Sequence, residues 1–109
     1  MCLVGRLPYF EHLYELGDRD YRRLGYLAWE YVRGKPEARR NLKLALERAR
    51  QAVAAKPDYG EAWDTIAVAL LDGGELEEAL KAAEKAVDLK DIPEHQETLD
   101  KISMLINNL

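Results

Sequence analysis

The side chains best suited to acid–base, nucleophilic or metal chemistry are sparse in this chain, and their spacing matches no catalytic pattern. The two histidines, His12 and His95, are far apart in the sequence. Neither belongs to a nucleophile, metal or phosphate motif. We therefore predict that each is exposed to solvent or faces a partner. The single cysteine, Cys2, cannot form an internal disulfide, which favours a reducing compartment.

The 20 acidic residues are the remaining candidates for chemistry. Their spacing follows helix surfaces, which is typical of a solvated face rather than of a metal or general-acid site. We therefore predict a protein that is not an enzyme, with no catalytic residues, no metal and no cofactor.

The composition indicates a soluble globular domain. The chain is 48% hydrophobic and 33% charged, and it contains no apolar run of about 20 residues that could span a membrane. The first residues lack a basic region followed by an apolar one, so no signal peptide is visible. We expect a cytoplasmic protein with no membrane partner.

Charge is divided unequally along the chain. Residues 1–57 hold 12 Lys/Arg and 7 Asp/Glu, a net +5, whereas residues 58–109 hold 4 and 13, a net −9. Opposite halves of this kind favour either contact between copies of the chain or a long-range field that steers a partner. Arg39, Arg40, Lys43, Arg48 and Arg50 form a basic stretch, but in an acidic chain they are typical of a solvated helix face, and nucleic acid is not an expected partner.

The helices that must position any functional site can be predicted from an internal repeat. At an offset of 34 residues, seven of fifteen positions are identical. The identities pair Leu42, Ala45, Leu46, Ala49, Ala52, Val53 and Lys56 with Leu76, Ala79, Leu80, Ala83, Ala86, Val87 and Lys90. Six of the seven are apolar and share one helix face, so the repeated feature is a packing surface. The alanines allow two helix backbones to approach closely.

Helix boundaries follow from the capping and turn residues. Asp58 and Glu61 have the spacing of a capping box, and the helix that they begin should stop at Asp72-Gly73-Gly74. A second helix is predicted from about Glu75 to Leu89, with acidic residues in its first turn. The two form an antiparallel helical hairpin.

This stretch resembles a tetratricopeptide repeat, a helix-turn-helix unit of 34 residues. Trp63, the pair Ile66-Ala67, the glycine turn, Ala79 and Ala86, and Pro57 closing the preceding unit match the signature of that family over residues 58–91. Ala83 and Asp91 depart from it, because an aromatic residue and a proline are usual there. The resemblance implies an all-α, right-handed α-solenoid of antiparallel hairpins with about six helices.

The remaining segments complete a single domain over residues 1–109. An N-terminal helix is predicted at 8–17, an irregular repeat at 21–57, the regular repeat at 58–91 and a capping helix at 93–109. In the irregular repeat, helices are predicted at about Tyr21 to Arg33 and Pro36 to Lys56. Its first helix aligns best at an offset of 39, which requires five extra residues near Gly34. In the capping helix, Leu99, Ile102, Ile106 and Leu109 are predicted to face inward.

In the resembled family, the first helix of each repeat lines a concave groove that binds peptides. Projected onto this chain, that groove contains Arg22, Tyr26, Trp29, Arg33, Asp64, Val68, Leu71 and Asp72. Asp64, Val68 and Asp72 do not supply the basic and amide groups of a chaperone carboxylate clamp. Tyr26 and Trp29 could equally belong to the core.

The sequence therefore favours a protein-protein interaction module, a scaffold or adaptor that binds a partner protein or peptide in the groove. The alternative is a structural protein that forms dimers or arrays through its oppositely charged halves.

Overall fold

The computed structural model describes residues 6–33 and 41–109, which form six α-helices and no strand. The helices are α1 (Arg6–Glu15), α2 (Tyr21–Arg33), α3 (Leu42–Ala55), α4 (Gly60–Asp72), α5 (Leu76–Leu89) and α6 (Pro93–Asn107). The predicted all-α class is confirmed. None of the helices in these two ranges is long and apolar enough to cross a membrane.

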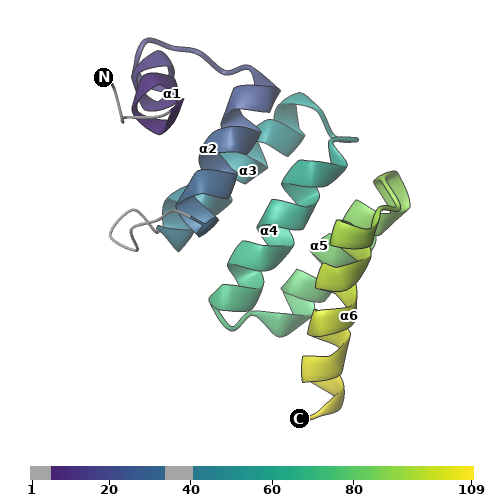
Figure 1. The fold of residues 1–109 in the computed structure, drawn as a ribbon. Helices are drawn as coiled ribbons and strands as arrows, with labels where there is room; N and C mark the ends of the chain where they lie inside the picture. The colour runs from purple at the N-terminus through teal and green to yellow at the C-terminus, as the bar shows by residue number, and fades with distance from the viewer. Residues whose placement is uncertain (1–5, 34–40) are drawn as a thin grey trace.

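The helices pack in chain order from one end of an elongated molecule to the other (Figure 1). Helices α2 and α3 form one antiparallel pair, and α4 and α5 form a second. Helix α4 also packs against both α2 and α6, so these three form a row. Helix α1 lies against α2 at one end, and α6 lies against α4 and α5 at the other.

The helix bounds repeat along the chain with the predicted offsets. Helices α2 and α4 both have 13 residues and are offset by 39, whereas α3 and α5 both have 14 residues and are offset by 34. The difference is the five-residue insertion predicted near Gly34, which lies between α2 and α3 and outside the described residues.

The repeated alanines form the centre of the helix packing. All six that coincide at the 34-residue offset are completely buried: Ala45, Ala49, Ala52, Ala79, Ala83 and Ala86. Leu46, Val53 and Leu80 pack beside the core clusters. Helices α3 and α5 also end in the same way: the backbone N–H of Lys56 donates to the carbonyl of Ala52, and that of Lys90 donates to the carbonyl of Ala86. The shared sequence positions are thus shared packing positions.

One predicted helix start and one predicted helix cap are wrong. Helix α3 begins at Leu42 rather than near Pro36, because the side chain of Asn41 accepts the backbone N–H of Leu44 and caps the helix. The capping box at α4 does not form, because the N-cap residue is Tyr59 rather than Asp58 and makes no side-chain cap hydrogen bond. Asp58 pairs with Lys56 at 3.0 Å, and Glu61 pairs with Lys90 at 2.6 Å.

The turn between α4 and α5 depends on Gly74, whose φ is +84°. The Gly74 N–H donates to the carbonyl of Leu71, and the Glu75 N–H donates to that of Leu70. This is a Schellman motif, which requires the left-handed conformation that glycine adopts without a steric penalty.

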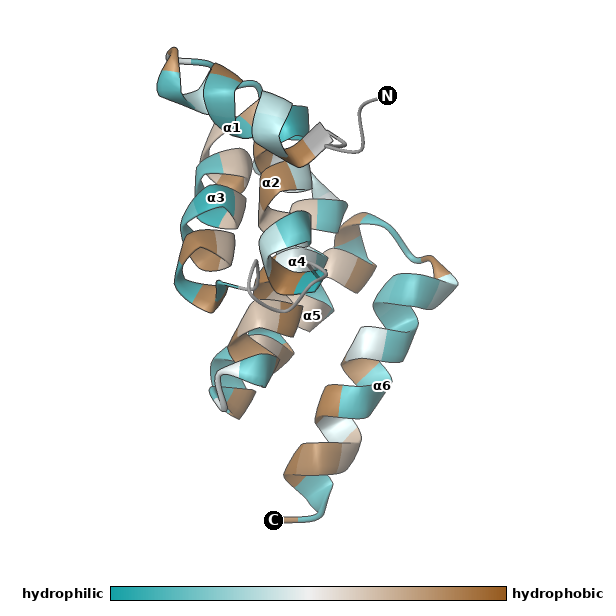
Figure 2. Cartoon of the chain, turned by 60° about the vertical axis from the view of Figure 1, so that its left-hand side comes forward, coloured by the Kyte–Doolittle hydropathy of each residue, from teal (hydrophilic) through white to brown (hydrophobic). Residues whose placement is uncertain are grey.

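The end of α6 differs from the prediction. Ile102 is fully buried, and Leu99 and Ile106 pack partly against the core. Leu109 is 93% exposed, because α6 ends at Asn107. Figure 2 shows hydrophobic residues in the last turns of α6, where Met104 and Leu105 are also exposed.

Candidate functional site

A pocket of about 490 Å³ opens where α2, α4 and the start of α6 meet. We call it the aromatic pocket, because it is lined by three aromatic side chains, those of Tyr26, Trp29 and Tyr59. The other lining residues are Arg22, Gly25, Glu61, Ala62, Asp64, Thr65, Ile92, Glu94 and His95. Three helices of one row therefore supply a single concave surface.

The eight residues predicted for the groove all line pockets along this row, but they divide between two pockets. Arg22, Tyr26, Trp29 and Asp64 line the aromatic pocket. Arg33, Val68, Leu71 and Asp72 line a small pocket of about 50 Å³, together with Glu97, Thr98 and Lys101 of α6.

The predicted groove residues differ in how much surface they offer. Trp29 is 40% exposed, which resolves its position in favour of the pocket surface rather than the core. Tyr26 is half-buried, and its ring meets the Phe10 ring edge to face with centroids 4.8 Å apart. Val68 belongs to the core, because it is only 5% exposed and packs with Leu27 and Tyr31. Trp29 is thus the aromatic side chain best placed to touch a partner.

Tyr59 reaches the aromatic pocket because Gly25 leaves space for it. A Cβ atom at Gly25 would lie 2.9 Å from Cε2 of Tyr59, closer than side chains tolerate. The Tyr59 ring also meets that of Tyr21 edge to face at 5.0 Å. Sequence reasoning missed Tyr59, although the absence of a side chain at a helix-interior position was a signal for close approach.

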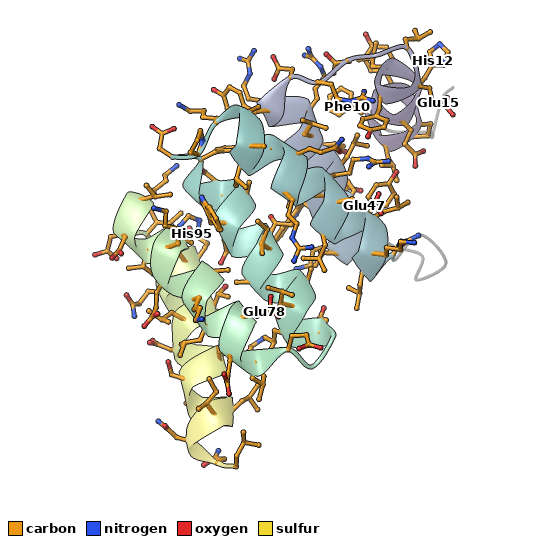
Figure 3. The ribbon with its side chains drawn as sticks, turned by 180° about the vertical axis from the view of Figure 1, so that it is seen from behind. Phe10, His12, Glu15, Glu47, Glu78 and His95 are labelled. Carbon is orange, nitrogen blue, oxygen red and sulfur yellow. The ribbon has the colours of Figure 1, made fainter. Side chains whose placement is uncertain are left out.

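His95 is buried, so of the two predicted positions exposure to solvent is wrong, and a position facing a partner stays a prediction. Its side chain is 2% exposed and lines the pocket at the start of α6. Nδ1 lies 2.8 Å from the carbonyl oxygen of Lys90. Because a carbonyl can only accept, Nδ1 carries a hydrogen. Figure 3 shows His95 far from His12, which is exposed on α1.

Asp64 is the least satisfied polar residue of the site. The residue is 7% exposed, and Oδ1 has no hydrogen-bond partner among the described residues. Burial raises the pKa of this carboxyl, whereas a hydrogen bond from Thr98 and the nearby His95 and Arg33 act to lower it. A buried carboxylate without full compensation is costly to the fold.

Other charged residues around the pocket are already paired. Arg22 donates to the Asp20 carboxylate through Nε and Nη2 at 3.2 and 3.1 Å. These bonds and the Arg22 backbone N–H lower the pKa of Asp20 to about 2. Burial raises the pKa of Glu61, but the Lys90 ammonium reverses the shift and leaves the pKa below its usual value.

A second hollow, the α3–α5 groove, lies on another face of α4. It measures about 610 Å³ and has an apolar floor containing Val53, Trp63 and Leu70. The indole N–H of Trp63 is satisfied by the carbonyl of Pro57 at 2.9 Å. Among its described lining residues, none is a buried polar group without a partner, in contrast to those of the aromatic pocket.

The predicted basic stretch does not form one patch within the described residues. Lys43 and Arg50 are exposed on α3. Arg48 is half-buried and lies 3.8 Å above the centroid of the Tyr14 ring. Arg39 and Arg40, like Cys2, lie outside the described residues.

Residues 6–33 and 41–109 contain no group of three or more His, Cys, Asp or Glu side chains arranged to hold a metal ion. No protein-family model matches the chain, and a search of curated proteins finds no match. The case for function therefore depends on the geometry of the aromatic pocket.

Proposed function

We propose that this protein is a tetratricopeptide-like interaction module, a right-handed solenoid of helical hairpins that binds a partner peptide or protein. The equal helix lengths, the offsets of 39 and 34, and the six buried alanines support this assignment. The module acts by binding, without a cofactor or a reaction of its own, and we place it in the cytoplasm.

The observation that carries the proposal is the half-exposed aromatic wall of the pocket. Trp29 is 40% exposed, and Tyr26 and Tyr59 line the same hollow. Aromatic side chains in concave sites supply much of the free energy of binding, because they bury a large area with little loss of rotamer freedom. Helices α2, α4 and α6 hold this wall in place before binding, so the partner segment bears most of the ordering cost.

The test is selection of peptides from a displayed random library, followed by titration of each selected peptide. We expect Trp29→Ala to weaken binding by about 2 kcal/mol, roughly thirtyfold in Kd. The matched control is Tyr9→Ala, because Tyr9 is a 61% exposed aromatic residue on α1 and does not line the pocket.

Circular dichroism of Trp29→Ala completes the experiment. The exposed position of Trp29 leads us to expect unchanged helicity. Unfolding of the variant would show that Trp29 supports the core, and equal weakening by Tyr9→Ala would show that the peptides bind elsewhere. Either result would refute the proposal.

A further inference from the structure

We infer that the partner inserts one lysine or arginine side chain into the aromatic pocket, with its charged head at the Asp64 carboxylate. This inference depends on the proposed function and specifies the chemistry of the partner. It starts from a conflict in the unbound protein: Asp64 is almost completely buried, yet its Oδ1 accepts no hydrogen bond from any described residue. An ammonium or guanidinium group is a donor that resolves this conflict.

The charges of the pocket favour a cation over an anion. Three carboxylates line it, those of Glu61, Asp64 and Glu94, and Arg22 is its one guanidinium. Arg22 is held by Asp20, and Glu61 is paired with Lys90. Arg33 and His95 also act on Asp64, but neither donates to its Oδ1, so Asp64 and Glu94 still present negative charge to an incoming side chain.

The walls suit the stem of a basic side chain. Trp29, Tyr26 and Tyr59 provide apolar ring surface for the methylene groups and a negative ring face for the charge. The chain already uses such contacts, since Arg33 lies 5.0 Å from the Trp29 centroid and Arg19 lies 3.6 Å from that of Tyr14. Arg33 lines the small pocket and is not among the lining residues of the aromatic pocket.

Access to the carboxylate requires only a local movement. Oδ1 is shielded from solvent in the unbound protein. The last torsion of an aspartate is broad and roughly two-fold, so rotation about it turns an oxygen towards the pocket without moving α4. The raised pKa of Asp64 has burial as its main cause, and a bound cation offsets that cost by stabilising the ionised form.

The experiment compares peptide selections on the unmodified protein and on Asp64→Asn. The control is Glu84→Gln, which makes the same carboxylate-to-amide change at an exposed position of α5 outside the pocket. We expect peptides selected on the unmodified protein and on Glu84→Gln to share a lysine or arginine at one position. Peptides selected on Asp64→Asn should lack it.

Titration then measures how strongly the basic residue of the peptide depends on Asp64. Replacing the shared basic residue of a selected peptide by methionine should weaken binding to the unmodified protein about tenfold or more. The same replacement should change binding to Asp64→Asn by much less. Thermal unfolding of Asp64→Asn confirms that the variant is folded before it is titrated.

The outcomes separate the two proposals. Peptides that are sensitive to Trp29→Ala but carry no shared basic residue, or bind Asp64→Asn equally well, would overturn the inference and leave the proposed function standing. Acidic peptides that are sensitive to Trp29→Ala would also overturn the inference and leave the proposed function standing. A library that yields no peptide sensitive to Trp29→Ala would overturn both.

Discussion

Replacing Asp64 by asparagine should make the protein more stable near neutral pH, although it removes the group that we expect to bind the partner. Asp64 is 7% exposed, and its Oδ1 lacks a partner among the described residues. Asparagine has nearly the same shape and keeps one acceptor oxygen, but it carries no charge. The cost of a buried unpaired group is larger when that group is ionised.

The expected gain in the free energy of unfolding follows from the difference in cost between burying a charged and a neutral unpaired group. That difference is about 1 kcal/mol, since hydrogen bonds to charged groups exceed neutral ones by about that amount. The entropy of unfolding of a chain of this length is about 0.2 kcal/mol per kelvin. Asp64→Asn should therefore raise Tm by about 4 °C at about pH 7.

The pH dependence gives a second check with a definite sign. Because burial raises the pKa of Asp64 in the folded protein, ionisation is less favourable there than in the unfolded chain. The penalty is absent below the ordinary pKa of 3.8 and is complete above the folded pKa. The advantage of Asp64→Asn should thus shrink as the pH falls towards about 3.5.

Differential scanning calorimetry of both proteins across this pH range makes the comparison. Carboxyl groups with lowered pKa values, such as those of Asp20 and Glu61, are present in both proteins and cancel in the difference. The exposed control Glu84→Gln should shift the free energy of unfolding by less than about 0.5 kcal/mol. An Asp64→Asn variant that is no more stable at neutral pH, or equally stabilised at every pH, would refute the reasoning.

Two further predictions concern the turn and the assembly state. Gly74→Ala should lower the free energy of unfolding by about 1 kcal/mol in urea titrations, because φ at Gly74 is +84°; Gly73→Ala, at φ −87°, is the control and should cost clearly less. Light scattering should give the 12.5 kDa mass of one chain at low and high salt. A larger species that dissociates in salt would favour assembly through the oppositely charged halves instead.

The helical framework could be predicted because its signals are short in range. Apolar residues at helical spacing, the alanine stripe and the glycine turn indicated α2, α4 and α5 within one or two residues of their ends. The 39-residue offset followed from avoiding a proline inside a helix, and the helix bounds agree with it. The family resemblance indicated one face of α2 and α4, where the predicted groove residues line pockets, but it did not include α6.

The prediction failed where a residue's surroundings come from distant helices. Glu61 of the predicted capping box pairs with Lys90, which lies 29 residues further along the chain. Val68 was predicted to line the partner groove, but it packs in the core with Leu27 and Tyr31 of α2. Periodicity indicates which face of a helix is apolar but not which neighbour covers each residue.

The sequence by itself determined that this chain forms paired helices with small residues between them, since helix propensity, apolar spacing and turn residues act over a few positions. Only the tertiary structure decided that Asp64 is buried without full compensation and that Tyr59 and His95 join Trp29 around one pocket. These residues come from helices that are distant in sequence. Their burial depends on how α2, α4 and α6 pack, and it is this packing that creates the proposed site.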